Sequence, residues 1–184
     1  MIDLKETSPL IGLSLPVTIG TATISERILE HATSIAPFQG QDAKLSAVLN
    51  SHIGLDLPAV GHASQSAQQE LFWCGQGLYM LTSPSETVQS LAPHLGKLAA
   101  LSDQSDAWAV LELRGTDASL IVARLCPLDM RGLKEGHAAR SEFAHMMSII
   151  QPRQNGYDIW VMRSFGKTAL HHLTVAAKSI AALT

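Results

Sequence analysis

A strand-to-helix turn that occurs twice is the feature that most limits the folds open to this chain. Residues 38–45 read FQGQDAKL and residues 113–120 read LRGTDASL, so both stretches carry Gly-x-Asp-Ala and a leucine two residues later. In each copy the glycine permits the positive φ with which a strand turns into a helix. The aspartate falls in the first helical turn, where the helix dipole stabilises its charge. The repeat indicates a duplicated scaffold, and a ligand-binding loop is the alternative.

The same order of elements surrounds both copies. In the first half, hydrophobic spacing predicts a strand, an amphipathic helix, a hairpin across Gln76-Gly77 and a helix that Ser83 or Ser85 caps and Pro93 ends or kinks; the strands are 27–38, 70–75 and 78–83. In the second half, the strands are 108–115, 137–150 and 156–163, and the helices cover 116–125 and a last segment that Ser164 caps. Each half therefore reads as strand, helix, strand, strand, helix.

We predict an α+β fold made of two duplicated βαββα (ferredoxin-like) halves, 27–104 and 105–184, in one compact domain. Residues 1–26 contain Pro9, Pro16 and many Ser and Thr. Such a segment buries little apolar surface of its own. We therefore expect it to be an extended N-terminal arm that gains order by lying against something else.

Composition excludes several classes of protein. The net charge is −3, and neither half is basic enough to predict nucleic-acid binding. No run approaches the ~20 apolar residues that cross a bilayer, and the N-terminal sequence lacks the pattern of an export signal. Cys74 and Cys126 form no disulfide framework or Cys-x-x-Cys pair. We expect a cytoplasmic protein with no membrane partner.

A search for catalytic and binding motifs finds no complete site. Gly166-Lys167-Thr168 resembles the end of a phosphate-binding loop, but Val161 stands where its first glycine belongs. The eight histidines show no metal-binding spacing. Cys126, which precedes Pro127, is the one candidate nucleophile, although a buried thiol without reactivity is the commoner case. We therefore predict no catalytic, cofactor-binding or metal-binding residue in this chain.

Four stretches resemble the gamma subunit of heterotetrameric sarcosine oxidase; they are LSDQSDAWAVLELRG (101–115), RLCPLDM (124–130), GHAARSEFAH (136–145) and VMRSFGKTALHHL (161–173). LFWCGQGLYMLTSP (71–84) is similar to the tryptophan-containing hairpin of that family, and the earlier portion matches loosely. Arg140-Ser141 departs from an arginine-threonine pair that the family tends to have. The resemblance implies a fold similar to the folate-binding domain of the glycine-cleavage aminomethyltransferase.

The resemblance also implies a function. The chain would be a non-catalytic, structural gamma subunit that binds no cofactor itself, in a complex that demethylates sarcosine or a related N-methyl amino acid to glycine with H2O2 and formaldehyde or 5,10-methylenetetrahydrofolate. FAD, FMN, NAD, tetrahydrofolate and zinc would lie in the alpha, beta and delta partner subunits. A stand-alone folate-binding protein is the alternative, although FWCGQG (72–77) lacks the Lys, Tyr and Glu of the signature of such proteins. A small enzyme that uses Cys126 is a third possibility.

Six residues are predicted to contact a partner subunit. They lie in or directly beside the family-like segments, where residues without a catalytic role often serve docking; they are Cys126, Pro127, Asp129, Arg131, Arg140 and Arg163. The arginines could meet an acidic surface or an anion, and a solvated basic rim is the alternative.

Overall fold

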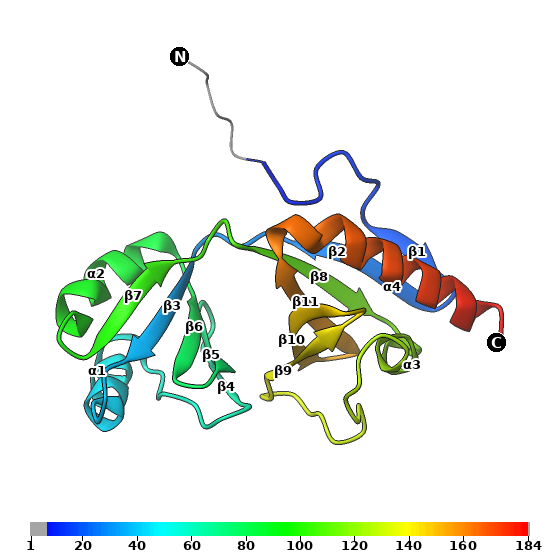
Figure 1. Cartoon of the computed structure of the whole chain (residues 1–184). Coiled ribbons are helices and arrows are strands. Elements are labelled where there is room, and N and C mark those ends of the chain that lie inside the picture. Colours follow the sequence, from blue (N-terminus) through cyan, green and yellow to red (C-terminus); the bar gives the residue numbers. More distant parts are fainter. Residues whose placement is uncertain (1–6, 184) are drawn as a thin grey trace, which may run out of the picture.

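The computed structural model describes residues 7–183, apart from the side chains of Ser85 and Glu86. The chain forms two antiparallel sheets that face one another, and each carries two helices on its outer side (Figure 1). The six-stranded sheet has the order β1 (Val17–Ile19), β2 (Ala22–Arg27), β8 (Trp108–Arg114), β11 (Gly156–Met162), β10 (Met146–Arg153), β9 (Ala139–Phe143). The five-stranded sheet has the order β4 (Ala63–Gln65), β5 (Glu70–Gly75), β6 (Leu78–Thr82), β3 (Ala32–Pro37), β7 (Ala99–Asp103). The predicted α+β class is confirmed.

The helices cover the outer face of each sheet. Helices α1 (Asp42–Ile53) and α2 (Ser85–Leu95) bury Leu45, Leu49, Leu91 and Leu95 against the five-stranded sheet. Helices α3 (Ala118–Ala123) and α4 (Gly166–Ala181) cover the six-stranded sheet. A third apolar cluster lies between the two sheets and contains Ala32, Phe72, Cys74, Met80, Val110, Ala138, Ile149 and Trp160. Because side chains alternate along a strand, each sheet contributes to one outer core and to this shared inner layer.

The prediction of an N-terminal arm over 1–26 is wrong for residues 17–26. This segment forms β1 and most of β2, and β2 pairs with β8 inside the six-stranded sheet. Ala22 and Ile24 are fully buried, whereas Thr23 and Ser25, which alternate with them, face the other side of the sheet. Residues 7–16 contain no helix or strand, and residues 1–6 lie outside the described residues. The six-stranded sheet therefore combines the start of the chain with its second half.

Other boundaries also differ from the prediction. The segment 137–150 holds two strands, β9 and β10, because Ala144 and His145 form a turn with φ of 46° and 66°. The segment 27–38 is a strand only from Ala32, and β4 and β7 were not predicted. The residues at the N-caps of α2 and α4 are Pro84 and Phe165, and neither side chain makes a capping hydrogen bond. A 3-10 turn, η1 (Arg163–Phe165), precedes α4, so Ser164 is not its cap. Pro93 lies inside α2, which continues to Leu95.

The two repeated turns differ in how closely other backbone approaches them. Gly40 has a φ of 73° with open space where a side chain would start, and Gly115 has a φ of 136° with the backbone of Thr21 and Ala22 against it. Asp42 lies in the first turn of α1, as predicted, and Asp117 precedes α3 and accepts a hydrogen bond of 2.6 Å from the Thr21 hydroxyl. The positive φ expected of both glycines is confirmed.

Alanine substitution should separate the two turns. We expect Gly40→Ala to cost about 1 kcal/mol, since a positive φ is its main penalty. Gly115→Ala should cost about 1–3 kcal/mol more, because its methyl group would overlap the carbonyl oxygen of Thr21 and push β2 away. Urea unfolding of both variants measures the difference. Equal midpoints would contradict the close approach of β2 at Gly115.

Candidate functional site

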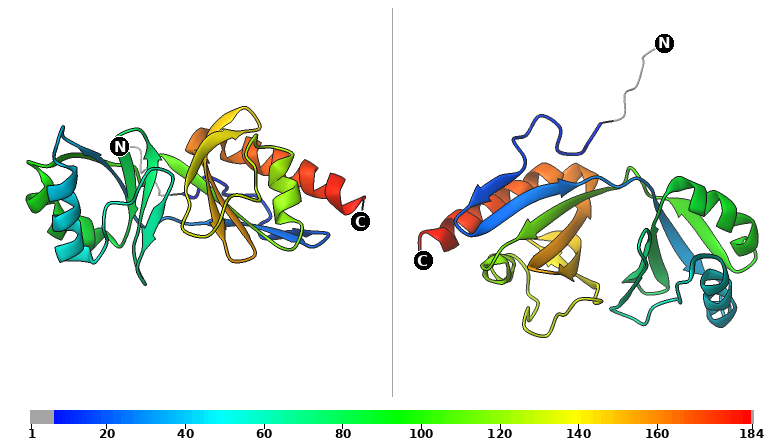
Figure 2. Two further views of the ribbon diagram at one scale, coloured as in Figure 1. Left: turned by 90° about the horizontal axis from the view of Figure 1, so that it is seen from below. Right: turned by 180° about the vertical axis from the view of Figure 1, so that it is seen from behind.

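Two crossover segments join the two sheets and run beside each other (Figures 1 and 2). Residues 28–31 connect β2 to β3, and residues 104–107 connect β7 to β8. The backbone N–H of Gln104 donates to the carbonyl of Ala32 at 2.8 Å, and the N–H of Ala32 donates to the Ser105 hydroxyl oxygen at 3.1 Å. The Asp-Gln-Ser-Asp-Ala-Trp stretch thus fastens one crossover to the other.

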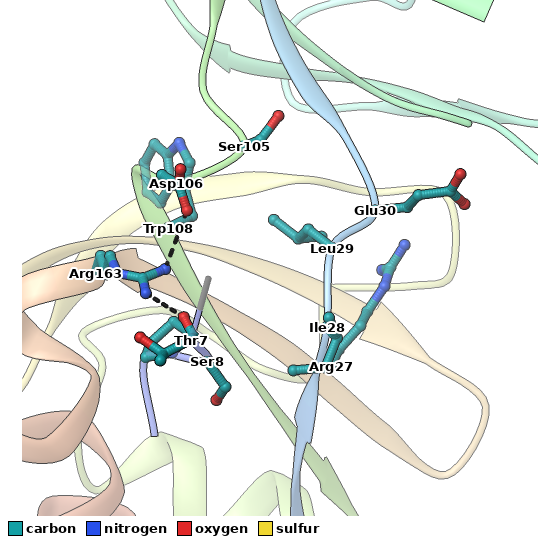
Figure 3. A pocket seen from close by; sticks show the side chains of 11 residues that line it. Thr7, Ser8, Arg27, Ile28, Leu29, Glu30, Ser105, Asp106, Trp108 and Arg163 are labelled. Carbon is teal, nitrogen blue, oxygen red and sulfur yellow. Dashed lines mark hydrogen bonds and ion pairs between the residues drawn. The ribbon is translucent and has the colours of Figure 1, made fainter. Parts of the chain in front are cut away.

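A hollow of about 310 Å³ lies at these crossovers, and Figure 3 shows its side chains. We call it the crossover pocket; its walls are Thr7, Ser8, Pro9, Arg27, Ile28, Leu29, Glu30, Ser105, Asp106, Trp108 and Arg163. The wall formed by the first crossover presents Ile28 and Leu29, and the opposite wall presents Trp108 and Arg163 (Figure 3). The pocket therefore unites four segments that are far apart in the sequence, namely 7–9, 27–30, 105–108 and Arg163.

Arg163, a predicted site residue, holds one wall of this pocket together. Its backbone N–H donates to the carbonyl of Ala107 at 2.8 Å. Its guanidinium lies 3.4 Å from a carboxylate oxygen of Asp106 and also donates to the carbonyl of Thr7 (Figure 3). The Arg-Ser-Phe segment, the Asp-Gln-Ser-Asp-Ala-Trp segment and residues 7–9 therefore meet at one place.

Ser105 lies near a histidine and an aspartate, but the geometry is not that of a catalytic triad. Its hydroxyl donates to Asp103 at 2.6 Å, and its oxygen lies 3.1 Å from Nδ1 of His31. In a triad the carboxylate orients the histidine and leaves the hydroxyl free to give its proton to that histidine. Here the hydroxyl donates its hydrogen bond to the carboxylate of Asp103 and not to the histidine. The hydrogen bonds from Ser105 lower the pKa of Asp103, so the group acts as a structural acceptor.

A second polar cluster lies on the inner face of the six-stranded sheet, around the buried Asp158. Its carboxylate contacts Arg114 at 2.5 Å, Arg153 at 2.8 Å and Arg27 at 3.1 Å. Burial alone would raise the pKa of Asp158, but Arg153 and Arg114 outweigh it and lower that pKa. Burial alone would lower the pKa of Arg153, but Glu70 and Asp158 outweigh it and raise that pKa. Asp158 and Arg153 are therefore both charged at neutral pH.

Glu70 extends the Asp158 cluster to the other sheet. This buried carboxylate on β5 accepts a hydrogen bond from Arg153 at 2.7 Å and one from the Gln151 amide at 2.9 Å. The Gln151 carbonyl oxygen in turn accepts from the indole of Trp160 at 2.7 Å. Each polar group of the Asp158 cluster has a hydrogen-bond or ion-pair partner, so the cluster joins the sheets and offers no free nucleophile or base.

The other predicted site residues lie at two further places. Cys126 is buried in the outer core of the six-stranded sheet, and Pro127 is exposed beside it. Asp129 and Arg131 form an exposed ion pair at 2.9 Å within the following loop. Arg140, on β9, extends over Gly75 of the β5–β6 hairpin and donates to the sulfur of Met147 at 3.1 Å. The six residues therefore occupy three separate regions, and their contact with a partner stays a prediction.

Sequence reasoning missed Ile28, Leu29 and Glu30, because the segment 27–38 was interpreted as one strand. It also missed Asp158, although its position between Tyr157 and Ile159 offered a signal. A charged residue at an inward position of an apolar strand needs a partner. Within residues 7–183, no group of three or more His, Cys, Asp and Glu side chains is placed to hold a metal ion, and no helix is long and apolar enough to cross a membrane.

Burial of Cys74 predicts a loss of stability at high pH. Burial raises the pKa of this thiol from 9.0 to about 11, and nearby Arg140 offsets only part of the rise. The neutral thiol favours the folded state, so its contribution is complete below pH 9 and is lost as the pH rises to about 11. We expect the free energy of unfolding of the wild type to fall by about 2 kcal/mol between pH 9 and pH 11 because of this thiol, and Cys74→Ala should lack that part of the fall. Urea midpoints measured from pH 8 to 11 test this. Burial also raises the pKa of Tyr79, so the decrease of the urea midpoint with pH should be smaller in Cys74→Ala without vanishing. An equal decrease in the variant and the wild type would mean that groups other than Cys74 cause it.

Comparison with known proteins identifies the fold. One chain of the heterotetrameric sarcosine oxidase from Corynebacterium sp. U-96, solved in complex with pyrrole 2-carboxylate, is similar over 96% of this chain and 96% of its own length, with a TM-score of 0.85 and 21% identity. The fold is similar to that of a sarcosine oxidase chain. No family model and no curated protein matches the sequence.

A weaker likeness extends to the glycine cleavage system aminomethyltransferase T from Bartonella henselae, with a TM-score of 0.60 and 14% identity. It covers 88% of this chain but 50% of the enzyme, so the chain spans about half of the aminomethyltransferase. The sarcosine oxidase chain, in contrast, has nearly the same extent as this one. The fold predicted from the sequence resemblance, an aminomethyltransferase-like fold, is therefore confirmed, and these identities show the fold alone.

Proposed function

We propose that this chain is the non-catalytic, structural gamma subunit of a cytoplasmic sarcosine-oxidase-type heterotetramer. The complex would demethylate sarcosine or a related N-methyl amino acid to glycine, with H2O2 and formaldehyde or 5,10-methylenetetrahydrofolate as the other products. The observation that carries the proposal is the end-to-end likeness to one chain of such a heterotetramer, at a TM-score of 0.85 and 96% of both chains. FAD, FMN, NAD, tetrahydrofolate and zinc would be held by the alpha, beta and delta partners.

The polar geometry supports a structural role. The Ser105 hydroxyl donates a hydrogen bond to Asp103, the Arg163 guanidinium bonds a backbone carbonyl and Asp106, and arginines neutralise the charge of Asp158. Groups that saturate one another stabilise a fold and are poorly placed to transfer protons or attack a substrate. Buried Cys126 lies in an apolar core, as expected of an unreactive thiol.

Co-expression with the products of neighbouring genes tests the proposal. We expect size-exclusion chromatography to give a stoichiometric complex with flavin absorbance that oxidises sarcosine or a related N-methyl amino acid. Cys126→Ala and Ser105→Ala complexes should keep turnover within about threefold, because neither group takes part in the chemistry. Elution of the wild-type chain by itself, or a loss of several orders of magnitude in turnover from an intact variant complex, would reject the proposal.

A stand-alone folate-binding protein is the second candidate, and the likeness to the aminomethyltransferase is the observation that favours it. Calorimetry with tetrahydrofolate on the isolated chain distinguishes the two. Clear micromolar binding would support the second candidate, whereas the structural-subunit proposal expects no heat of binding at these concentrations.

We also infer that the two halves descend from one duplicated, ferredoxin-like βαββα unit. The strand order β5-β6-β3-β7 in one sheet has its counterpart in β10-β11-β8-β2 in the other. Helices follow corresponding strands in both, and Gly40 and Gly115 occupy corresponding turns. In the second half, β2 from the start of the chain takes the place that β7 takes in the first.

A further inference from the structure

The first crossover presents unpaired backbone beside the crossover pocket. Among residues 7–183, the N–H and C=O groups of Ile28, Leu29 and Glu30 make no hydrogen bond, whereas His31 already bonds Ser83. Ile28 is 66% exposed. In an isolated chain, water forms hydrogen bonds with these backbone groups. Three consecutive residues with unpaired N–H and C=O groups also resemble the exposed edge of a β-sheet, to which an extended peptide can add as a further strand.

Two residues that line the hollows on either side of this crossover carry buried polar atoms without partners. They are Trp108 of the crossover pocket, through its indole Nε1, and Ser83 of an adjoining hollow of about 380 Å³, through its hydroxyl. Neither atom has a hydrogen-bond partner among the described residues. A buried donor without a partner costs free energy, and an occupant of the hollow could bond these atoms only after their side chains move.

The chemistry of the pocket indicates what kind of segment fits. Leu29 points from the first crossover toward Trp108 on the opposite wall, and the space between them suits one aliphatic or aromatic side chain (Figure 3). Around it, the side chain of Asp106 is 87% exposed with one contact of 3.4 Å, and Glu30 forms no ion pair within the described residues. Arg27 and Arg163 are already engaged with acidic groups. Because Arg163 and Asp106 neutralise one another, the uncompensated charge at the rim is the negative charge of Glu30.

We propose that the crossover pocket receives an extended segment of a partner subunit, which adds as a strand along residues 28–30, inserts an apolar side chain between Leu29 and Trp108, and places a lysine or arginine opposite Glu30. This inference rests on the proposed function, since it assigns to the heterotetramer the surface by which this chain is held. The residues concerned belong to the two crossovers, so the segment would also clamp the junction between the two sheets.

Assembly of the heterotetramer with surface variants tests this docking surface. Ile28→Asp places a charge at an exposed position, so the isolated variant should keep the thermal midpoint of the wild type. Its affinity for the purified complex of the other subunits, measured by biolayer interferometry, should fall at least tenfold. Val60→Asp is the matched control, because Val60 is 70% exposed in the loop between α1 and β4 and outside the pocket; its affinity should change less than twofold. Glu30→Lys should weaken binding more at low salt than at high salt.

Hydrogen exchange supplies an independent readout. The amides of residues 28–30 should exchange within seconds in the isolated chain and become protected by at least a hundredfold in the complex. Equal binding by the Ile28→Asp and wild-type chains, or amides 28–30 that stay unprotected in an assembled complex, would overturn the docking surface while leaving the subunit proposal intact. Failure of the wild-type chain to bind the other subunits would instead reject the subunit proposal and the docking surface with it.

Discussion

Replacing Asp158 with alanine is expected to lower the free energy of unfolding by about 3–5 kcal/mol, the usual cost of removing one partner from a buried ion pair. The carboxylate is 1% exposed and contacts Arg27, Arg114 and Arg153. Without it, three guanidinium groups would face one another with Glu70 and Glu112 as the remaining acids. Urea unfolding followed by circular dichroism measures the loss.

The matched control is Asp129→Ala. Asp129 also pairs with an arginine at 2.9 Å, but both side chains lie at the surface, so removal of this pair should leave the urea midpoint unchanged. If Asp158→Ala lowered the free energy of unfolding by less than about 1 kcal/mol, solvation of the arginines by water would be enough to replace the carboxylate. The comparison therefore separates burial from ion-pair geometry as the source of stability.

The pH dependence of the stability that Asp158 contributes has a definite sign. Because the folded-state pKa of Asp158 is lowered, its contribution is complete above the unfolded value of about 3.9 and is lost as the pH falls through the folded pKa. The difference in stability between the wild type and Asp158→Asn should thus be constant from pH 5 to 7 and shrink below about pH 4. A difference that already shrinks at pH 6 would assign the effect to another group.

The sequence predicted the elements that carry long apolar runs between turn residues. The strands at 70–75 and 108–115 were placed within a residue, because ELFWCG and WAVLELRG are bounded by glycine and rich in residues that fit a sheet. It failed at β2, whose buried face consists of Ala22 and Ile24 among Thr and Ser. A strand so short of apolar residues forms because β8 offers it a partner, and that partner lies more than eighty residues along the chain.

The candidate site was less predictable, because it is built from contacts between distant segments. Arg163 could be singled out from its place before the last helix, and Trp108 from its place in a strand. Neither position indicated that residues 7–9 and the first crossover would complete the pocket around them. Their meeting depends on how the two sheets are joined, which local pattern does not specify.

Trp160 gives the second large prediction, because it lies where the two sheets meet. Its ring is fully buried and packs on Phe72 of the opposite sheet, with ring centroids 5.1 Å apart, and its indole N–H donates to Gln151. Trp160→Ala should cost about 3–5 kcal/mol through the cavity that it leaves. Because that cavity falls between the sheets, the two halves should no longer unfold together.

The form of the unfolding curve tests this second effect. We expect the urea transition of Trp160→Ala, followed by circular dichroism, to broaden or divide into two steps with a lower m value for each. Trp160→Phe keeps an aromatic ring against Phe72 but loses the hydrogen bond to Gln151, so it should cost less and keep one transition. A single, steep transition in the alanine variant would show that the ion pairs of Glu70 with Arg153 and Arg27, which cross between the sheets, suffice to couple them. The Glu70→Ala variant should then be the one that uncouples them.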